Sequence, residues 1–223
     1  MYSQNAMNIS QFDPLGLALL LGSLSLMPLL LICTTCFLKA SVVLMIVKNA
    51  IGVQQVPPAI AVYAIALSIT AFVMAPVIRD IGSNLGIVNG KLPAEKITVE
   101  RIVQAVEPLR SFMLKNTSID HRERLLNVAR KHGSKTALSM RDSDYVVLIP
   151  AFVISELQLA FEIGFVLYVP MIVIDLLVSN ILLALGMQMV SPMVVSMPLK
   201  ILLFVALDGW FRLFEGLALS YLW

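Results

Sequence analysis

Apolar residues fill both ends of the chain, whereas residues 82–145 are much more polar. Residues 15–38 form an uninterrupted apolar run, which is long enough to cross a bilayer as an α-helix. Because apolar residues continue beyond Lys39, the pattern predicts that this helix extends to Lys48 and bends at Pro28. The N-terminal part is therefore expected to begin with one long, kinked helix.

A segment rich in Gly, Gln and Pro ends this helix, and we name it the first turn, residues 52–58. Its candidate turn residues are Gly52, Gln54, Gln55, Pro57 and Pro58. Glycine, amide side chains and a proline pair do not readily continue a helix. Because residues 59–78 are apolar again, residues 1–81 are predicted to form an N-terminal helical hairpin.

The polar segment 82–145 carries 11 of the 16 Lys and Arg residues together with seven acidic residues, so we expect it to face water. Apolar residues recur at helical spacing from Val99 to Met113 and predict an amphipathic helix that bends at Pro108. A second helix is expected over 118–132. The segment is therefore predicted to be a helical insert.

Residues 146–223 return to apolar character and predict a C-terminal helical hairpin. Pro150 suits the first turn of a helix, and Pro170 is expected to kink that helix. The chain reverses at a Met-rich second turn, residues 186–192, and a final apolar segment follows at 193–222. The predicted fold is all-α, with two long kinked hairpins joined by the polar helical insert.

The first and second turns align without a gap, and Gly52 and Pro58 coincide with Gly186 and Pro192. The aligned segments also share Ala, Gln and Val at equivalent places. An internal repeat and a chance match in so apolar a chain both stay open. We retain the inference that both hairpins turn on a similar Gly-to-Pro loop.

The composition indicates a membrane or membrane-assembly protein, because 59% of the residues are hydrophobic and the mean hydropathy is +0.89. A net charge of +2 is too small to indicate nucleic-acid binding. No Lys or Arg precedes Lys39, so the first helix lacks the basic start of a signal peptide and is expected to be retained. Cys33 and Cys36 are expected to be packing residues, and His121 and His132 lack the accompanying ligands of a metal site.

Seven charged residues interrupt the apolar C-terminal hairpin: Glu156, Glu162, Asp175, Lys200, Asp208, Arg212 and Glu215. The first five are the candidate buried charges or subunit-interface residues. A charged residue at a helix centre costs about 2.5–3.5 kcal/mol on insertion, whereas each Leu, Ile, Val or Phe gains roughly 0.3–0.6 kcal/mol. Insertion of the first helix of this hairpin as a lone lipid-facing helix is therefore marginal. In one interpretation the carboxylates pair with Lys39, Lys200 or Arg212 inside the chain. In the interpretation that we favour, they line a water-filled path or a subunit interface.

Specific motifs give the chain a resemblance to a known family. They are GVQQVPP at 52–58, PAF at 150–152, SEL at 155–157, DL at 175–176, LALGM at 183–187, MVSP at 189–192, PLK at 198–200 and DGW at 208–210. With these motifs the chain resembles the SctR family, the R component of the bacterial type III secretion export apparatus, which includes flagellar FliP. The motifs fall within residues 37–78 and 147–215, and the insert adds almost nothing.

This resemblance implies a homopentamer in the bacterial inner membrane that assembles with the S and T components, with the U switch protein nearby. The pentamer is expected to form the channel entrance for unfolded secreted proteins, with the insert on the periplasmic side. The family's gasket loop maps onto Met187, Gln188 and Met189, where Gln188 replaces a Met of many members. No catalysis and no cofactor are expected, since no nucleophile triad, phosphate loop or metal cluster occurs.

The alternative function is a proton-coupled secondary transporter. In that case Glu156, Glu162 and Asp175 would act as a proton relay within the membrane. A transporter would be a free-standing monomer or dimer that moves a small solute, whereas the export subunit would form a ring with its partners.

Overall fold

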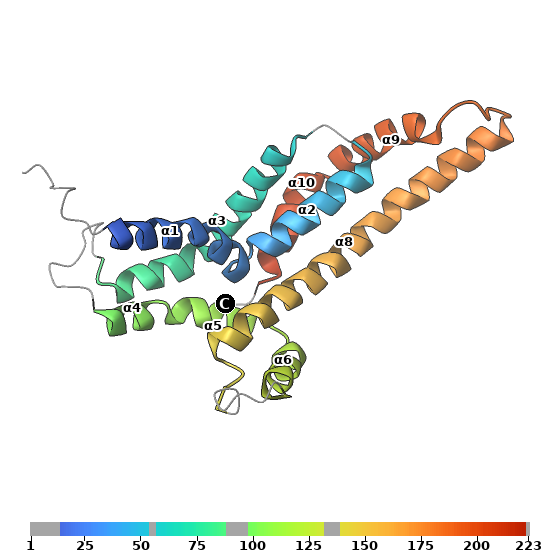
Figure 1. The fold of residues 1–223 in the computed structure, drawn as a ribbon. Helices are drawn as coiled ribbons and strands as arrows, with labels where there is room; N and C mark the ends of the chain where they lie inside the picture. Colours follow the sequence, from blue (N-terminus) through green and yellow to red (C-terminus); the bar gives the residue numbers. More distant parts are fainter. Residues whose placement is uncertain (1–13, 54–56, 88–97, 132–138, 222–223) are drawn as a thin grey trace, which may run out of the picture.

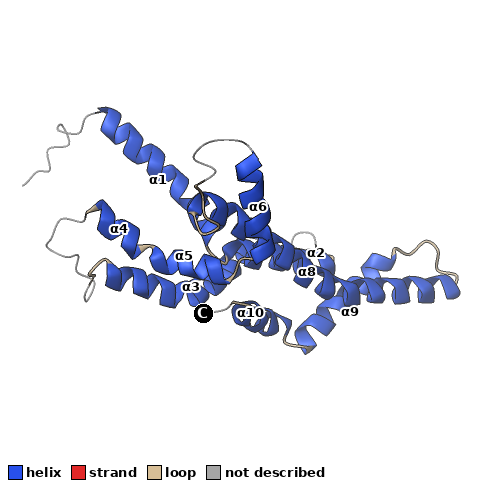
Figure 2. Cartoon of the chain, turned by 90° about the horizontal axis from the view of Figure 1, so that it is seen from below, coloured by secondary structure: helices blue, strands red, loops and turns tan. Residues whose placement is uncertain are grey.

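The computed structural model describes residues 14–53, 57–87, 98–131 and 139–221. Its helices are α1 (Pro14–Thr34), α2 (Phe37–Ile51), α3 (Ala59–Asn84), α4 (Val99–Ala105), α5 (Glu107–Lys115), α6 (Ile119–Lys131), α8 (Tyr145–Ala184), α9 (Pro192–Ala206) and α10 (Gly209–Leu219). Figures 1 and 2 show an elongated molecule with helices throughout the described ranges and no strand among them. The predicted all-α fold is confirmed for these residues.

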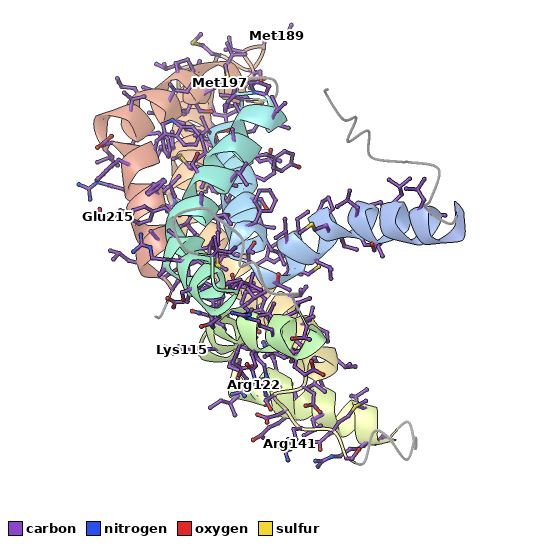
Figure 3. The ribbon with its side chains drawn as sticks, turned by 90° about the vertical axis from the view of Figure 1, so that its left-hand side faces the viewer. Lys115, Arg122, Arg141, Met189, Met197 and Glu215 are labelled. Atoms are coloured by element: carbon purple, nitrogen blue, oxygen red, sulfur yellow. The ribbon has the colours of Figure 1, made fainter. Side chains whose placement is uncertain are left out.

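The first apolar run is divided into α1 and α2, so the prediction of one helix kinked at Pro28 is wrong. Pro28 lies inside α1, and the break comes at Thr35 and Cys36. The hydroxyls of Thr34 and Thr35 donate to the carbonyls one turn earlier, at 2.7 and 2.6 Å, and the Thr35 hydroxyl accepts the Phe37 N–H. Such side-chain bonds compete with the helical ladder. As a result α1 projects sideways from the other helices (Figure 3).

The core forms where α2 lies between α3 and α8. Its fully buried residues include Ala40, Val43 and Leu44 of α2, Val62, Ala66 and Ile69 of α3, and Leu148, Phe152 and Ala160 of α8. Gly164 allows α2 and α8 to approach closely, since an added Cβ there would lie 2.5 Å from Ile46 Cδ1. This close contact between α2 and α8 packs the first hairpin against the second.

The insert contains the two predicted helical regions, with one division. The amphipathic stretch is split into α4 and α5 at Val106, and Pro108 stands near the start of α5, where a missing N–H costs nothing. The buried side chains of Phe112 and Met113 attach α5 to the core. The helix expected at 118–132 is α6.

The C-terminal hairpin differs from the prediction at two points. Helix α8 begins at Tyr145, so Pro150 lies in its second turn and not in its first. The final apolar segment is bent by 61° between α9 and α10, where one continuous segment was predicted. Asp208 turns the chain at this corner with a positive φ of 53°. Gly209 permits the close approach of the Phe204 ring, since an added Cβ there would lie 2.5 Å from Phe204 Cε2.

Within the described residues, three helices are long and apolar enough to cross a membrane: α1, α3 and α8. The bent α9–α10 pair would make a fourth if it acts as one span. Along α1, the residues from Leu21 to Ile32 are all exposed, and burial begins only at the end of the helix, where Thr34 is covered.

Candidate functional site

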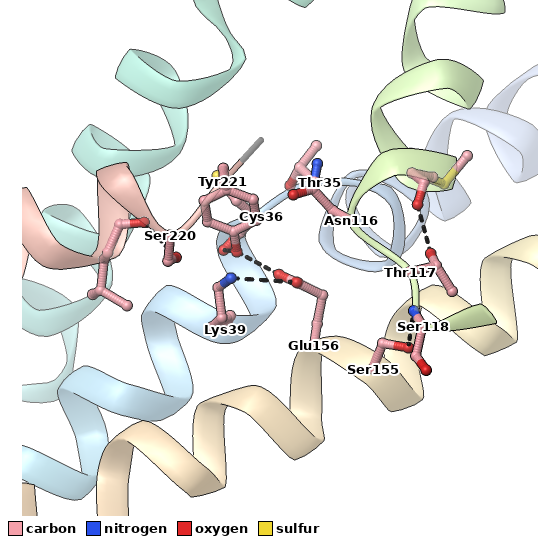
Figure 4. A network of polar contacts seen from close by, with 12 residues as sticks. Thr35, Cys36, Lys39, Asn116, Thr117, Ser118, Ser155, Glu156, Ser220 and Tyr221 are labelled. Atoms are coloured by element: carbon pink, nitrogen blue, oxygen red, sulfur yellow. Dashed lines mark hydrogen bonds and ion pairs between the residues drawn. The ribbon is translucent and has the colours of Figure 1, made fainter. Parts of the chain in front are cut away.

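Glu156 of α8 is buried inside the chain and contacts Lys39 and Tyr221 there (Figure 4). The Lys39 ammonium lies 3.5 Å from Glu156 Oε1, and the two side chains are 1% and 0% exposed. The Tyr221 hydroxyl donates to Glu156 Oε2, and the Tyr221 ring lies under the Lys39 ammonium at 3.6 Å from its centroid. The carboxylate is therefore neutralised by a partner within the same chain.

This buried pair joins three parts of the sequence that are far apart. Lys39 comes from α2, Glu156 from α8 and Tyr221 from the residues after α10. Burial lowers the pKa of Lys39, and the nearby Glu156 opposes that shift. Burial also raises the pKa of the Cys36 thiol to about 11 and raises the pKa of Tyr221. A charge left alone in such a place is costly, so each member of the pair depends on the other.

A second polar group connects α8, α9 and the end of α2. The Lys200 ammonium donates to Asp175 Oδ2 at 2.6 Å and to the Ala50 carbonyl at 3.0 Å. The Ser196 hydroxyl donates to Asp175 Oδ1 at 2.6 Å. Lys200 is nearly buried, whereas the Asp175 side chain is 44% exposed. We call this group the Asp175–Lys200 bridge: Asp175, Ser196, Lys200 and the Ala50 carbonyl.

Glu162 and Asp208 stay at the surface. Glu162 accepts a hydrogen bond of 2.8 Å from Gln158 one turn earlier on α8, and Asp208 stands exposed at the α9–α10 corner. Arg212 donates to the Leu207 carbonyl. For Glu156 and Asp175 the structure therefore agrees with pairing inside the chain, the interpretation that we did not favour, whereas Glu162 and Asp208 remain available to partners.

A polar pocket of about 680 Å³ lies between α6 and α8, and Glu156 and Lys39 form part of its wall. On its rim, His121 Nδ1 lies 2.7 Å from the Ser155 hydroxyl, which also accepts the Ser118 N–H at 3.2 Å. These contacts hold α6 against α8. No group of three or more His, Cys, Asp and Glu side chains suited to a metal ion occurs in the part of the chain that is described.

The first and second turns share their main features. Gly52 and Gly186 follow α2 and α8 with φ angles of 88° and 72°, a conformation that glycine adopts without strain. Each donates its N–H three residues back, to Asn49 and Leu183. Pro57 and Pro58 lead into α3, and Pro192 begins α9. Gln54 and Gln55 lie outside the described residues.

The candidate gasket residues lie at the far end of the C-terminal hairpin. Figure 3 shows Met189 at that extremity, and its side chain is 100% exposed. Met187 is 44% exposed and Gln188 is also exposed. The chain leaves Met189 uncovered and covers Met187 only in part, so both are available for contact with another molecule.

Sequence reasoning missed Tyr221, Ser196 and Ser155 as polar partners. Tyr221 lies 65 residues from Glu156, and no local pattern connects them. Ser196 did carry a usable signal, since it lies one helical turn before Lys200 and therefore on the same face of α9.

Known proteins resemble this chain over almost its whole length. Residues 20–217 match the FliP family. The harpin secretion protein HrcR of Erwinia amylovora is 52% identical over 217 residues, which cover 97% of this chain and 100% of that protein. The Yop proteins translocation protein R of Yersinia pestis is 41% identical, covering 94% and 97%. The surface presentation of antigens protein SpaP of Salmonella typhimurium is 36% identical, also covering 94% and 97%.

Proposed function

The chain belongs to the FliP family, and from this membership and the exposed second turn we propose that it is a core export-gate subunit of a type III secretion system. Relatives of 52% and 41% identity are named for secretion of harpins and translocation of Yop proteins, so the cargo we assign is unfolded secreted protein. Several copies together form the channel entrance.

One observation carries the proposal: the second turn is an uncharged, exposed end of a hairpin whose buried charges are already paired. Met189 is fully exposed, while Glu156 and Asp175 are bound to lysines within the chain. Methionine is flexible and adapts to partners of changing shape, which suits a ring that closes on itself and opens for a polypeptide. Gln188, between the two methionines, supplies hydrogen-bonding groups to the same ring.

We assign a homopentamer that assembles with the S and T components and has the U switch protein nearby. A closed ring uses two different surfaces of each subunit, and exposed apolar residues are plentiful on both sides of the C-terminal hairpin, such as Phe165 on α8 and Leu202 on α9. Such surfaces are costly to leave in water and favour burial against further subunits. The subunit performs no catalysis and uses no cofactor, and its partners supply the energy.

The assembly is placed in the bacterial inner membrane, with the insert, residues 82–145, on the periplasmic side. Helix α1 suits contact with lipid, since Gly16–Thr34 carries no Asp, Glu, Lys or Arg and its residues from Leu21 to Ile32 are exposed. The insert contains many charges and is long enough to be translocated regardless of its excess of Lys and Arg.

A proton-coupled transporter fits the geometry poorly. Glu156 and Asp175 are 19 residues apart on one helix, which corresponds to about 28 Å along its axis, and each is occupied by its own lysine. Glu162 lies between them at the surface with Gln158. A relay needs groups within hydrogen-bonding reach, directly or through water.

The test is deletion of the gene in its host, followed by measurement of secreted proteins in the medium. We expect secretion to stop while intracellular substrate persists, and a plasmid copy to restore it. Undiminished secretion in the deletion strain would overturn the proposed function.

A further inference from the structure

The Asp175–Lys200 bridge attaches the C-terminal hairpin to the end of α2, next to the first turn. Lys200 of α9 donates to the Ala50 carbonyl, two residues before Gly52 of the first turn. Gly52 also approaches the start of α9, since an added Cβ there would lie 3.5 Å from Met193 Cε. A pocket of about 480 Å³ between them is lined by residues of both turns and by the bridge. The base of the second turn is thus fixed to the first turn.

The second turn extends beyond this point of attachment. Asp175 is nine residues before the end of α8, which is about 14 Å along the helix axis. Lys200 is eight residues after the start of α9 at Pro192, or about 12 Å. The segment between them carries Met187 and Met189 at its exposed end, so a small change of angle at the bridge is enlarged there.

The bridge is a single point that joins three elements. The Lys200 ammonium reaches both the Asp175 carboxylate on α8 and a carbonyl in the last turn of α2, where a cation is favoured. Ser196 occupies the second oxygen of the same carboxylate. Loss of the ammonium therefore removes the bond of α9 to α2 and one of the two side-chain bonds between α9 and Asp175 of α8.

We infer that Asp175, Ser196 and Lys200 are positioning residues for the pore: they fix the second turn on the first turn, and the seal depends on this attachment. This inference rests on the proposed function, since it assigns the seal to the second turn. None of the three residues touches the cargo; they act through Met187 and Met189.

The first experiment measures dye leakage from liposomes that contain the complete export complex, with assembly checked by gel filtration. Lys200→Met is expected to raise leakage roughly tenfold, the change expected when hydrogen bonds to a charged group are lost. Lys200→Arg keeps a donor to both partners and should leak as little as the parent. Asp175→Asn should leak less than Lys200→Met, and the double variant no more than Lys200→Met alone.

The matched control is Asp120→Asn, which removes the carboxylate of an exposed ion pair with Arg124 in the insert and should change nothing. Met187→Ala with Met189→Ala serves as the reference for an open seal. The inference would be overturned if Lys200→Met leaked no more than the parent while the methionine variant leaked. The proposed export-gate function would stand in that case.

If the variant with both methionines replaced does not leak, the second turn is not the seal. A second measurement then still tests whether the bridge fixes the position of the second turn. Spin labels at Val53→Cys and Met189→Cys, in a chain with Cys33→Ala and Cys36→Ala, report the distance between the two turns. We expect one narrow distribution with Lys200 or Lys200→Arg and a broad one with Lys200→Met. An equally narrow distribution in Lys200→Met would overturn the attachment itself.

Discussion

Lys39 Nζ lies 3.5 Å from Glu156 Oε1, where both side chains are excluded from water. The two residues lie more than 100 positions apart in the sequence, on α2 and α8, and the Tyr221 hydroxyl joins them from the C-terminal end. This buried ion pair is thus one of the polar contacts that join the two apolar hairpins. The Glu156 carboxylate disfavours α8 as a lone lipid-facing helix, but in the folded chain it is paired with Lys39 and removed from lipid.

Removing one partner of this pair is expected to be strongly destabilising. Lys39→Met should lower the free energy of unfolding by about 3–5 kcal/mol, because it leaves the Glu156 carboxylate buried without a cation. The measurement is denaturant unfolding in detergent, followed by tryptophan fluorescence. The double variant with Glu156→Gln should lose less than the sum of the two single changes. Additive losses would show that the two groups do not interact. The control is Glu162→Gln, a change at an exposed residue, which should alter the free energy of unfolding by less than about 0.5 kcal/mol.

Tyr221→Phe isolates the contribution of one hydroxyl, because the ring over Lys39 is kept. We expect a loss of about 1–3 kcal/mol, the range for a hydrogen bond to a charged group and for an unsatisfied buried acceptor. Tyr63→Phe is the control, since Tyr63 is an exposed residue whose ring faces Phe37. Equal stability of the two variants would contradict the role assigned to the Tyr221 hydroxyl.

The two cysteines should react differently with an alkylating reagent. Cys36 is buried and its pKa is raised from 9.0 to about 11, so at pH 8 only about one thiol in a thousand is the reactive thiolate. Cys33 is partly exposed and should be modified first, as read by mass spectrometry of the native protein. Faster modification of Cys36 than of Cys33 at pH 8 would contradict the packing of this junction.

The same shift fixes the sign of a pH effect on stability. The folded chain holds the Cys36 proton more tightly than the unfolded chain, whose thiol has the ordinary value of 9.0. This contribution is present in full below pH 9 and is lost as the pH rises through about 11. Cys36→Ser should therefore flatten the alkaline loss of stability, and the comparison of unfolding at pH 8 and pH 11 measures it.

Gly164 should not accept a side chain while Ile46 is present. Gly164→Ala places a Cβ about 2.5 Å from Ile46 Cδ1 and is expected to cost about 1–3 kcal/mol through overpacking. Ile46→Ala in the same chain should recover part of this loss, which a thermal unfolding series can measure. Gly216→Ala is the matched control in another helix, where an added Cβ meets nothing within 4 Å. The close α2–α8 contact would be contradicted if Gly216→Ala lowered the stability and Gly164→Ala did not.

If Met187 and Met189 seal the pore, replacing both with Ala should raise leakage of ions or small molecules while assembly is unchanged. The shorter side chains leave a gap that the ring cannot fill. Reconstituted complexes and a conductance or dye assay provide the measurement. Unchanged leakage would remove both residues from the gate.

Helical periodicity and turn composition predicted much of this fold, because they act locally. The Gly-to-Pro sequences of both turns predicted where the hairpins reverse, and the spacing from Val99 to Met113 predicted the insert helices. The break at Thr35 escaped prediction because it depends on hydroxyl bonds within an apolar run, a weak signal. The corner at Asp208 also escaped prediction, because a positive φ is rare for residues other than glycine.

The pairing of charges could be predicted only in part. Lys39 and Lys200 were both recognised as possible partners of the carboxylates, but which one binds Glu156 depends on how α2 and α9 lie against α8. Tyr221 approaches Glu156 through the bend between α9 and α10, which the apolar pattern did not show. Long-range packing therefore decided what local patterns left open.

The most direct test of the export-gate assignment is an electron cryo-microscopy structure of the complex purified from host membranes through a tag on this chain. We predict a ring of five copies together with the S and T components, with Met187, Gln188 and Met189 of every copy facing the central axis. A free-standing monomer or dimer, or a ring in which the second turns point away from the axis, would contradict it.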